Sequence, residues 1–270
     1  MQVYRGMDIG TAKPSPRARE RLPHHLIDVA DPREQYNAGR FVNEAEALVA
    51  SVAARGRTPV VSGGTAFYLT SLMYGLPETP PVDPQTRERL RDKLEREGQP
   101  ALYRRLQERD PDAALRIQPN DRYRTLRALE VMEATNRSLF SFAWPRTLRA
   151  DMRFLLLGIQ RERAELYARI ERRVDAMFRQ GLVEEIRGLL EKGYGPADPG
   201  MRGIGYRQVL AMRDGCETLA QVRQRIAAET RRYAKRQLTF FRAVPGVTWV
   251  SAEHPHELAS RMAAFLAPAP

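Results

Sequence analysis

Two kinds of apolar pattern run along this chain, and together they predict a mixed α/β fold. Short apolar runs predict strands at 24–29, 58–62, 152–158 and 247–250. Apolar positions that recur every three or four residues predict helices at 38–54, 66–74, 162–179, 181–191, 206–213, 217–242 and about 255–266. Strands that lead through turns into helices are typical of a parallel sheet covered by helices.

One block of the chain contains helical patterns only. Prolines at 77, 80, 81 and 84 interrupt the sequence and indicate a boundary. After them, helical patterns follow one another at 83–97, 100–109, 112–117 and 120–135. The sequence therefore predicts an α/β core, residues 1–80 and 137–270, that carries an all-helical insertion, residues 81–136.

The composition narrows the class of protein. Of the 270 residues, 43% are hydrophobic, which indicates a globular chain with a large core. The one cysteine, Cys216, excludes an internal disulfide and a zinc site of clustered cysteines, and without a nearby catalytic partner it is expected to be inert. No stretch approaches the roughly 20 apolar residues that a membrane span needs. These features fit a cytoplasmic protein.

The net charge of +11 favours a polyanionic partner such as nucleic acid. The positive charge is nearly all arginine, since lysine occurs only at 13, 93, 192 and 235. A bias toward arginine can also come from a GC-rich genome. Net charge alone leaves both explanations open, so the positions of the basic residues matter more than their sum.

The strongest local signal is the turn Ser62-Gly63-Gly64-Thr65, between a predicted strand and a predicted helix. A helix N-terminus after two glycines presents free N–H groups to an anion, and the helix dipole favours negative charge there. Thr65 adds a hydroxyl at the helix start. A capped turn without a ligand has the same pattern, so the residues alone leave both interpretations open.

Other segments combine charge with flexibility or with an aromatic ring. The loop Gly6–Lys13 holds a carboxylate, Asp8, and a cation, Lys13, and the alternative is an ordinary loop in which Asp8 caps a turn. In 201–208, two arginines and a tyrosine surround two glycines, which suits contact with phosphate and stacking on a base. The alternative there is a loop that caps the next helix.

Two predicted helices carry basic faces. In 120–135, Arg124 and Arg127 lie on one face of the helix. The alternative to a binding surface is a solvated basic face in which Arg127 pairs with Glu130. In 217–242, a basic stripe of Arg231, Lys235, Thr239 and Arg242 lies beside an apolar stripe of Val222, Ile226, Tyr233 and Phe240. His254 and His256 lack a third ligand nearby, so no metal site is predicted.

Four of these stretches resemble one family. They are Met1-Gln-Val-Tyr-Arg-Gly-Met-Asp-Ile-Gly-Thr-Ala-Lys-Pro14, Asn120-Asp-Arg-Tyr-Arg-Thr-Leu-Arg-Ala-Leu-Glu130, Arg202-Gly-Ile-Gly-Tyr-Arg-Gln208 and Lys235-Arg-Gln-Leu-Thr-Phe-Phe-Arg242. In this order they are similar to the motifs of tRNA dimethylallyltransferases. The resemblance implies a P-loop-NTPase-like parallel sheet core with an all-helical insertion domain. It also implies a monomeric enzyme that transfers a dimethylallyl group from dimethylallyl diphosphate to N6 of the adenosine 3′ of the tRNA anticodon, with Mg²⁺.

The same resemblance implies roles for individual residues. Thr65 is expected to be catalytic, and Asp8, Lys13, Gly63 and Gly64 are expected to line the substrate site. The residues expected to bind tRNA are Met1, Gln2, Arg87, Tyr123, Arg124, Thr125, Leu126, Arg127, Arg202, Gly203, Ile204, Gly205, Tyr206, Arg207, Lys235, Arg236, Gln237, Leu238, Thr239, Phe240, Phe241 and Arg242.

The first stretch lies in the interior of family members, after a phosphate-binding loop and an Asp-Ser pair, and no Gly-x-x-x-x-Gly-Lys-[Ser/Thr] loop occurs here. This leads to two hypotheses: an enzyme whose start lies upstream of Met1, or a truncated, catalytically inactive tRNA-binding remnant. A transferase that acts on free adenine nucleotides is disfavoured, because the basic helical insertion would have little to bind.

Overall fold

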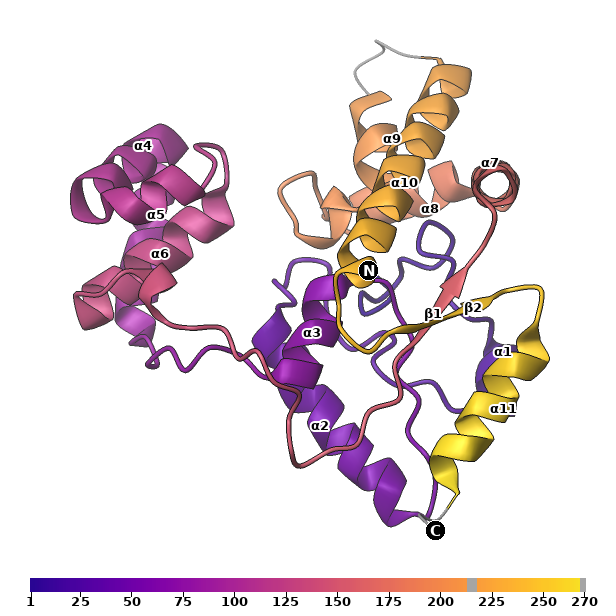
Figure 1. Ribbon diagram of the computed structural model, residues 1–270. Coiled ribbons are helices and arrows are strands. Elements are labelled where there is room, and N and C mark those ends of the chain that lie inside the picture. The colour runs from indigo at the N-terminus through magenta and orange to yellow at the C-terminus, as the bar shows by residue number, and fades with distance from the viewer. Residues whose placement is uncertain (213–217, 268–270) are drawn as a thin grey trace. The chain divides into compact units, whose positions relative to one another are not determined.

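The computed structural model describes residues 1–212 and 218–267, and Figure 1 shows their arrangement. The chain forms two compact units, residues 1–73 with 150–270 and residues 74–149. The predicted insertion, residues 81–136, lies inside the second unit. Cys216 falls outside the described residues, so its expected inertness stays a prediction.

The first unit is mixed α/β. Its helices are α1 (Pro16–Arg21), α2 (Ala38–Ala54), α3 (Ala66–Tyr74, whose last residue begins the second unit), α7 (Arg163–Arg179), α8 (Leu182–Glu191), α9 (Tyr206–Met212), α10 (Leu219–Arg242) and α11 (Pro255–Leu266), with a short 3-10 helix at Gly200–Arg202. Its strands are β1 (Leu157–Gln160) and β2 (Thr248–Ser251). They pair in parallel, with Leu157 opposite Thr248 and Gln160 opposite Ser251 (Figure 1).

Two of the four predicted strands are wrong. The predicted strand 24–29 is reduced to one parallel bridge, in which Ala30 exchanges backbone hydrogen bonds with the chain beside Tyr4. Leu26 and Asp28 adopt positive φ angles of 58° and 59°, which a strand does not accommodate. In 58–62, no strand of the described residues pairs with the segment. A β-branched run remains irregular where no neighbouring strand completes its hydrogen bonds.

Two helices of the first unit, α7 and α9, pack against α10. Helix α10 begins at a capping box between Thr218 and Gln221, and it buries Val222 and Ile226 against its neighbours α7 and α9. On the other side of the unit, Phe41 of α2 stacks on Tyr68 of α3 with 5.0 Å between the ring centroids. The predicted helices 38–54, 66–74 and 255–266 have the bounds expected from the sequence.

All the regular secondary structure of the second unit is helical. It contains α4 (Pro84–Arg109), α5 (Pro111–Arg116), α6 (Arg122–Thr135) and a short 3-10 helix, Leu139–Ser141. The two helices predicted at 83–97 and 100–109 run on as α4, which bends where Gly98 adopts a φ of 79° ahead of Pro100. Its core is formed by Leu90, Leu94, Leu102, Leu106, Ala113, Ala114, Ile117, Ala128 and Leu129.

Candidate active site

A carboxylate from α8 holds the loop that contains Asp8. Glu185 accepts hydrogen bonds from the backbone N–H groups of Asp8 at 2.8 Å, Ile9 at 2.7 Å and Gly10 at 3.3 Å. The hydroxyl of Tyr206 donates to the same carboxylate at 2.6 Å. Successive N–H groups of this kind form a concave anion site, and here an internal side chain fills it. The loop backbone is therefore held in place by Glu185, a residue of α8.

Tyr206 is part of the interior, which corrects the role expected from the sequence. Its side chain is 1% exposed, and a Cβ added at Gly10 would lie 2.5 Å from its ring. Burial, together with the hydrogen bond to Glu185, raises the pKa of Tyr206. A ring enclosed in this way cannot stack on a base. Its place in the sequence motif is explained by support of the loop.

The remainder of the segment 202–207 divides between interior and surface. Gly203 and Gly205 are buried and Ile204 is half-buried. A Cβ at Gly203 would lie 2.7 Å from the Met1 side chain. Arg202 and Arg207 are exposed, although Arg202 donates to the carbonyl of Ala197 at 2.7 Å and Arg207 forms an ion pair with Glu229. These two arginines are the polar groups that the segment offers to a ligand.

Lys13 is buried and forms ion pairs with two carboxylates. Its side chain is 2% exposed, and its ammonium lies 2.5 Å from a carboxylate oxygen of Asp8 and 2.5 Å from one of Asp28. Burial alone would raise the pKa of Asp28, but hydrogen bonds from Lys13 and Arg19 outweigh it and lower that pKa. The charge of Lys13 is thus balanced by one carboxylate of the loop, Asp8, and by Asp28 outside it. The Asp8 side chain stays 61% exposed.

Gln2 also holds the Gly6–Lys13 loop, through hydrogen bonds to the loop backbone. Its side-chain amide donates to the carbonyls of Thr11 at 3.2 Å and Ala12 at 3.0 Å. These bonds tie the N-terminal residues to the far end of the loop. Met1 keeps 47% of its surface exposed, so its side chain contacts Gly203 and solvent at once.

The turn Gly63-Gly64-Thr65 precedes α3 and is open to solvent. Gly63 and Thr65 are exposed, and nothing lies within 4 Å of a Cβ placed on Gly63. The Thr65 carbonyl accepts the first bonds of the helix, from the N–H groups of Tyr68 at 3.0 Å and Leu69 at 3.2 Å. No backbone N–H from 58 to 65 has a hydrogen-bond partner among the described residues. The turn therefore presents the unpaired donors that an anion requires.

Helix α10 passes next to this turn. The side-chain amide of Gln237 donates to the Gly64 carbonyl at 2.7 Å, and the hydroxyl of Tyr233 lies 3.5 Å from the same oxygen. The predicted RNA-binding residues around Gln237 mostly face solvent. Lys235, Arg236, Thr239, Phe240 and Arg242 are exposed, whereas Leu238 and Phe241 are half-buried.

A basic depression of about 250 Å³ lies between α7 and α10. It is lined by Tyr167, Ala228, Arg231, Arg232 and Lys235. Arg231 lies over the Tyr167 ring at 5.7 Å and pairs with Glu171 at 2.7 Å. Among the described residues, Arg232 and Lys235 have no carboxylate partner. The sequence gives no signal for the contribution of Tyr167, because only the packing of α7 on α10 places it there.

In the second unit, the predicted RNA-binding residues differ in exposure. Tyr123 is 55% exposed, and the Arg124 side chain is 66% exposed beside Asp121. Arg87 and Arg127 both reach Glu130, at 3.5 Å and 3.3 Å, and Arg127 also donates to Thr79 at 3.0 Å.

Two members of this set face inward. Thr125 is fully buried and bonds to the Asp121 carbonyl at 2.8 Å, and Leu126 packs against the core. The Thr125 side chain is thus enclosed, and the Leu126 side chain is half-buried. Tyr123 and Arg124 are the exposed members of the set, whereas Arg87 and Arg127 are half-buried.

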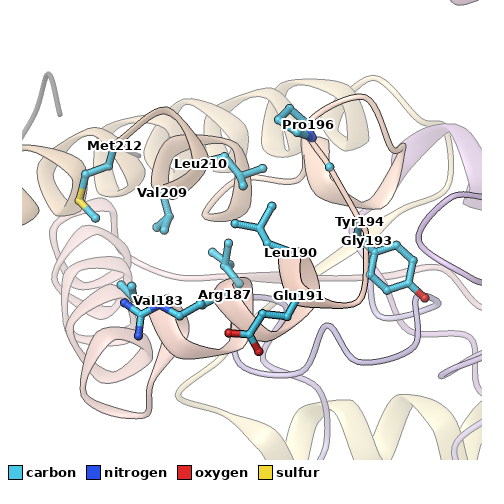
Figure 2. Close-up of a pocket in the computed structure, with 12 residues that line it drawn as sticks. Val183, Arg187, Leu190, Glu191, Gly193, Tyr194, Pro196, Val209, Leu210 and Met212 are labelled. Carbon is cyan, nitrogen blue, oxygen red and sulfur yellow. The ribbon is translucent and has the colours of Figure 1, made fainter. Parts of the chain in front are cut away.

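Figure 2 shows a larger cavity of about 570 Å³ between α8 and α9. Apolar side chains such as Val183, Leu190, Val209 and Leu210 line it, with Arg187 and Glu191 among them. No residue singled out from the sequence contributes to its wall. It is separate from the turn and the loop described above.

Across residues 1–212 and 218–267, no group of three or more His, Cys, Asp or Glu side chains is placed to hold a metal ion. In the same residues, no helix combines the length and the apolar character that crossing a bilayer requires.

The α/β fold thus places a turn with unpaired backbone donors beside a basic helix, an arrangement that proteins use to bind phosphate groups. Residues 2–244 match the family model "IPP transferase", and the chain belongs to this family. A tRNA dimethylallyltransferase of Syntrophobacter fumaroxidans is 46% identical over 265 residues, which are 97% of this chain and 77% of the relative.

Solved structures give the same result. The tRNA isopentenylpyrophosphate transferase of Bacillus halodurans is 34% identical, with a TM-score of 0.66 over 97% of this chain and 86% of that one. A eukaryotic dimethylallyltransferase acting on tRNA is 27% identical, with a TM-score of 0.73 over 98% of this chain and 69% of that one. The P-loop-type α/β fold class expected from the sequence is confirmed.

Proposed function

We propose that this protein transfers a dimethylallyl group from dimethylallyl diphosphate to N6 of the adenosine 3′ of the anticodon in tRNA. The family model and relatives named tRNA dimethylallyltransferase support the reaction class. The observation that carries the assignment in this chain is the open Gly63-Gly64-Thr65 turn held next to the basic helix α10. The hypothesis of an inactive tRNA-binding remnant is not better supported.

The reaction forms a bond from N6 of adenosine to the allylic carbon and breaks the bond from that carbon to the diphosphate oxygen. The electron pair of the broken bond leaves with the diphosphate, and a base takes the proton of the amine. Negative charge grows on the diphosphate, so donors aimed at that position stabilise the transition state. The unpaired N–H groups of the turn and the Thr65 hydroxyl are suited to this role.

The adenosine must leave the stack of the anticodon loop to reach the donor, which costs less in a single-stranded loop than in a duplex. While the adenosine is out of the stack, the exposed side chains of Arg232 and Lys235 would hold the RNA backbone. Mg²⁺ was expected from the family resemblance. Among the described residues, no group of three or more His, Cys, Asp or Glu side chains could hold it, and the Asp8 carboxylate is paired with Lys13.

Replacing Thr65 with alanine tests this function. The Thr65→Ala variant should lower kcat/KM for dimethylallyl diphosphate by about 10- to 100-fold, because one donor to the developing charge is lost. Thr65→Ser keeps the hydroxyl and should stay within a few-fold of the unaltered protein. The measurement is transfer of labelled dimethylallyl to tRNA. The exposed Thr58, in the same segment, provides the control variant Thr58→Ala, and equal loss in both variants would refute the role of Thr65.

A separate prediction concerns the binding of tRNA at the basic depression. The double variant Arg232→Ala/Lys235→Ala should weaken tRNA binding and reduce the slope of log Kd against log salt by about 1 to 2, since about 0.7–0.9 is lost with each phosphate contact. Fluorescence anisotropy across a salt series measures this slope. Arg169 of α7 is 53% exposed and pairs loosely with Glu165, so Arg169→Ala is the matched control. An unchanged slope in the double variant would exclude the depression from the interface.

A further inference from the structure

The segment that leads into the proposed diphosphate site depends on very few tertiary bonds. Residues 58–62 pair with no strand of the described residues, and Val60 and Val61 are 69% and 46% exposed. From 58 to 64, the carbonyl of Gly64 is the one group that takes part in a hydrogen bond to the described residues elsewhere in the chain. The direction of the turn therefore depends on what holds that carbonyl.

Gln237 is the closer of the two donors to it. Its Nε2 lies 2.7 Å from the Gly64 oxygen, within the usual range for a good hydrogen bond, whereas the Tyr233 hydroxyl lies at the limit, 3.5 Å. A Cβ added at Gly64 would lie 1.9 Å from the same nitrogen. Glycine at 64 is thus what permits the Gln237 amide to approach.

The carbonyl of Gly64 and the N–H of Thr65 belong to one peptide unit. Because this unit is planar and trans, its N–H points away from its C=O. A donor that fixes the Gly64 oxygen consequently fixes the direction of the Thr65 N–H. The same bond polarises the peptide and makes that N–H a stronger donor. Gln237 acts in this way on a group that it does not touch.

We propose that Gln237 is a positioning residue for the diphosphate-binding turn, and that its amide serves Gly64 instead of contacting RNA. This inference rests on the proposed function, since it takes the ligand of the turn to be the diphosphate of the prenyl donor. Its neighbours Lys235 and Arg236 are exposed and remain available to the RNA backbone. One helix therefore carries the RNA-binding surface on one side and orients the donor site on the other.

The test measures two affinities on the same variants. Inorganic diphosphate is the probe for the turn, by calorimetry, and an anticodon stem-loop is the probe for the RNA surface, by anisotropy. Gln237→Ala and the nearly isosteric Gln237→Glu, which has no N–H to donate, should each raise the Kd for diphosphate about five- to tenfold. Binding of the stem-loop by Gln237→Ala should stay within twofold. The exposed Gln224 of the same helix supplies the control Gln224→Ala.

Gly64 allows an independent check. In Gly64→Ala, the new methyl group displaces the Gln237 amide, so this variant should lose as much diphosphate affinity as Gln237→Ala. The double variant should lose no more than either single one, because both remove the same bond. The steady-state kinetics of these variants should change in the same way as the diphosphate affinity. KM for dimethylallyl diphosphate should rise, while KM for tRNA should stay constant.

Each other outcome decides against the proposal. Weaker stem-loop binding by Gln237→Ala with unchanged diphosphate affinity would make Gln237 an RNA contact. Additive losses in the double variant would show that the two residues act separately. If the unaltered protein binds diphosphate but none of the Gln237 variants changes its affinity, the inference fails and the proposed function stands. If the unaltered protein binds neither probe, the proposed function fails first and the inference with it.

Discussion

The variant Glu185→Ala is expected to lower the free energy of unfolding of the first unit by about 3–5 kcal/mol, the larger of the two main effects predicted here. Its carboxylate accepts bonds from three consecutive N–H groups, at residues 8, 9 and 10, and from the Tyr206 hydroxyl. Alanine would leave the buried Tyr206 hydroxyl and the half-buried N–H groups of Ile9 and Gly10 without this acceptor. Urea denaturation followed by circular dichroism measures the loss.

The chain offers a close control for this experiment. Glu184 is the preceding residue of α8 and is exposed, so Glu184→Ala should change stability by no more than about 0.5 kcal/mol. Glu185→Gln should fall between the two, because the amide has one acceptor oxygen and brings a donor of its own. Similar losses of stability in Glu184→Ala and Glu185→Ala would mean that alanine weakens helix α8 itself, and that the hydrogen bonds of Glu185 contribute little.

The variant Gly10→Ala is expected to destabilise the same unit by about 2–3 kcal/mol. A Cβ at this position would lie 2.5 to 2.7 Å from the Cε2, Cζ and Oη atoms of Tyr206. The ring is rigid and buried, so it cannot move aside as a flexible chain end would. Thermal denaturation should show a clear fall in Tm.

Gly188 shows what an alanine does where there is space. It lies in α8, and a Cβ there would meet nothing within 4 Å. Gly188→Ala should stabilise the protein by about 0.5–1 kcal/mol, since glycine is the poorer residue inside a helix. Opposite signs for Gly10→Ala and Gly188→Ala are the expected result. A Gly10→Ala variant as stable as the unaltered protein would show that the contact with Tyr206 relaxes.

Local patterns were enough to predict the helices. Helical periodicity placed α2, α3 and α11 at their observed bounds. These features depend on residues within a few positions of one another. The sequence also contains the motifs of the family that the comparisons confirm.

The strands could not be predicted in the same way. The run 58–62 has the composition of a buried strand, yet Val60 is 69% exposed because no partner strand pairs with it. In contrast, 157–160 forms a strand because β2, some 90 residues later in the chain, runs beside it. A strand requires a neighbour as well as its own residues.

The roles of the site residues show the same division. The sequence by itself determined which residue types lie in the Gly6–Lys13 loop, in the Gly-Gly-Thr turn and on α10. Only the tertiary structure decided that Lys13 is neutralised by Asp8 and Asp28, that Tyr206 is enclosed, and that Gln237 bonds to Gly64. A motif records the residues, but burial and hydrogen-bond partners also come from outside it: Lys13 meets Asp28, and residues 10 and 206, or 64 and 237, meet although more than 100 positions separate them. Those long-range contacts determine whether a polar side chain is free to meet a ligand.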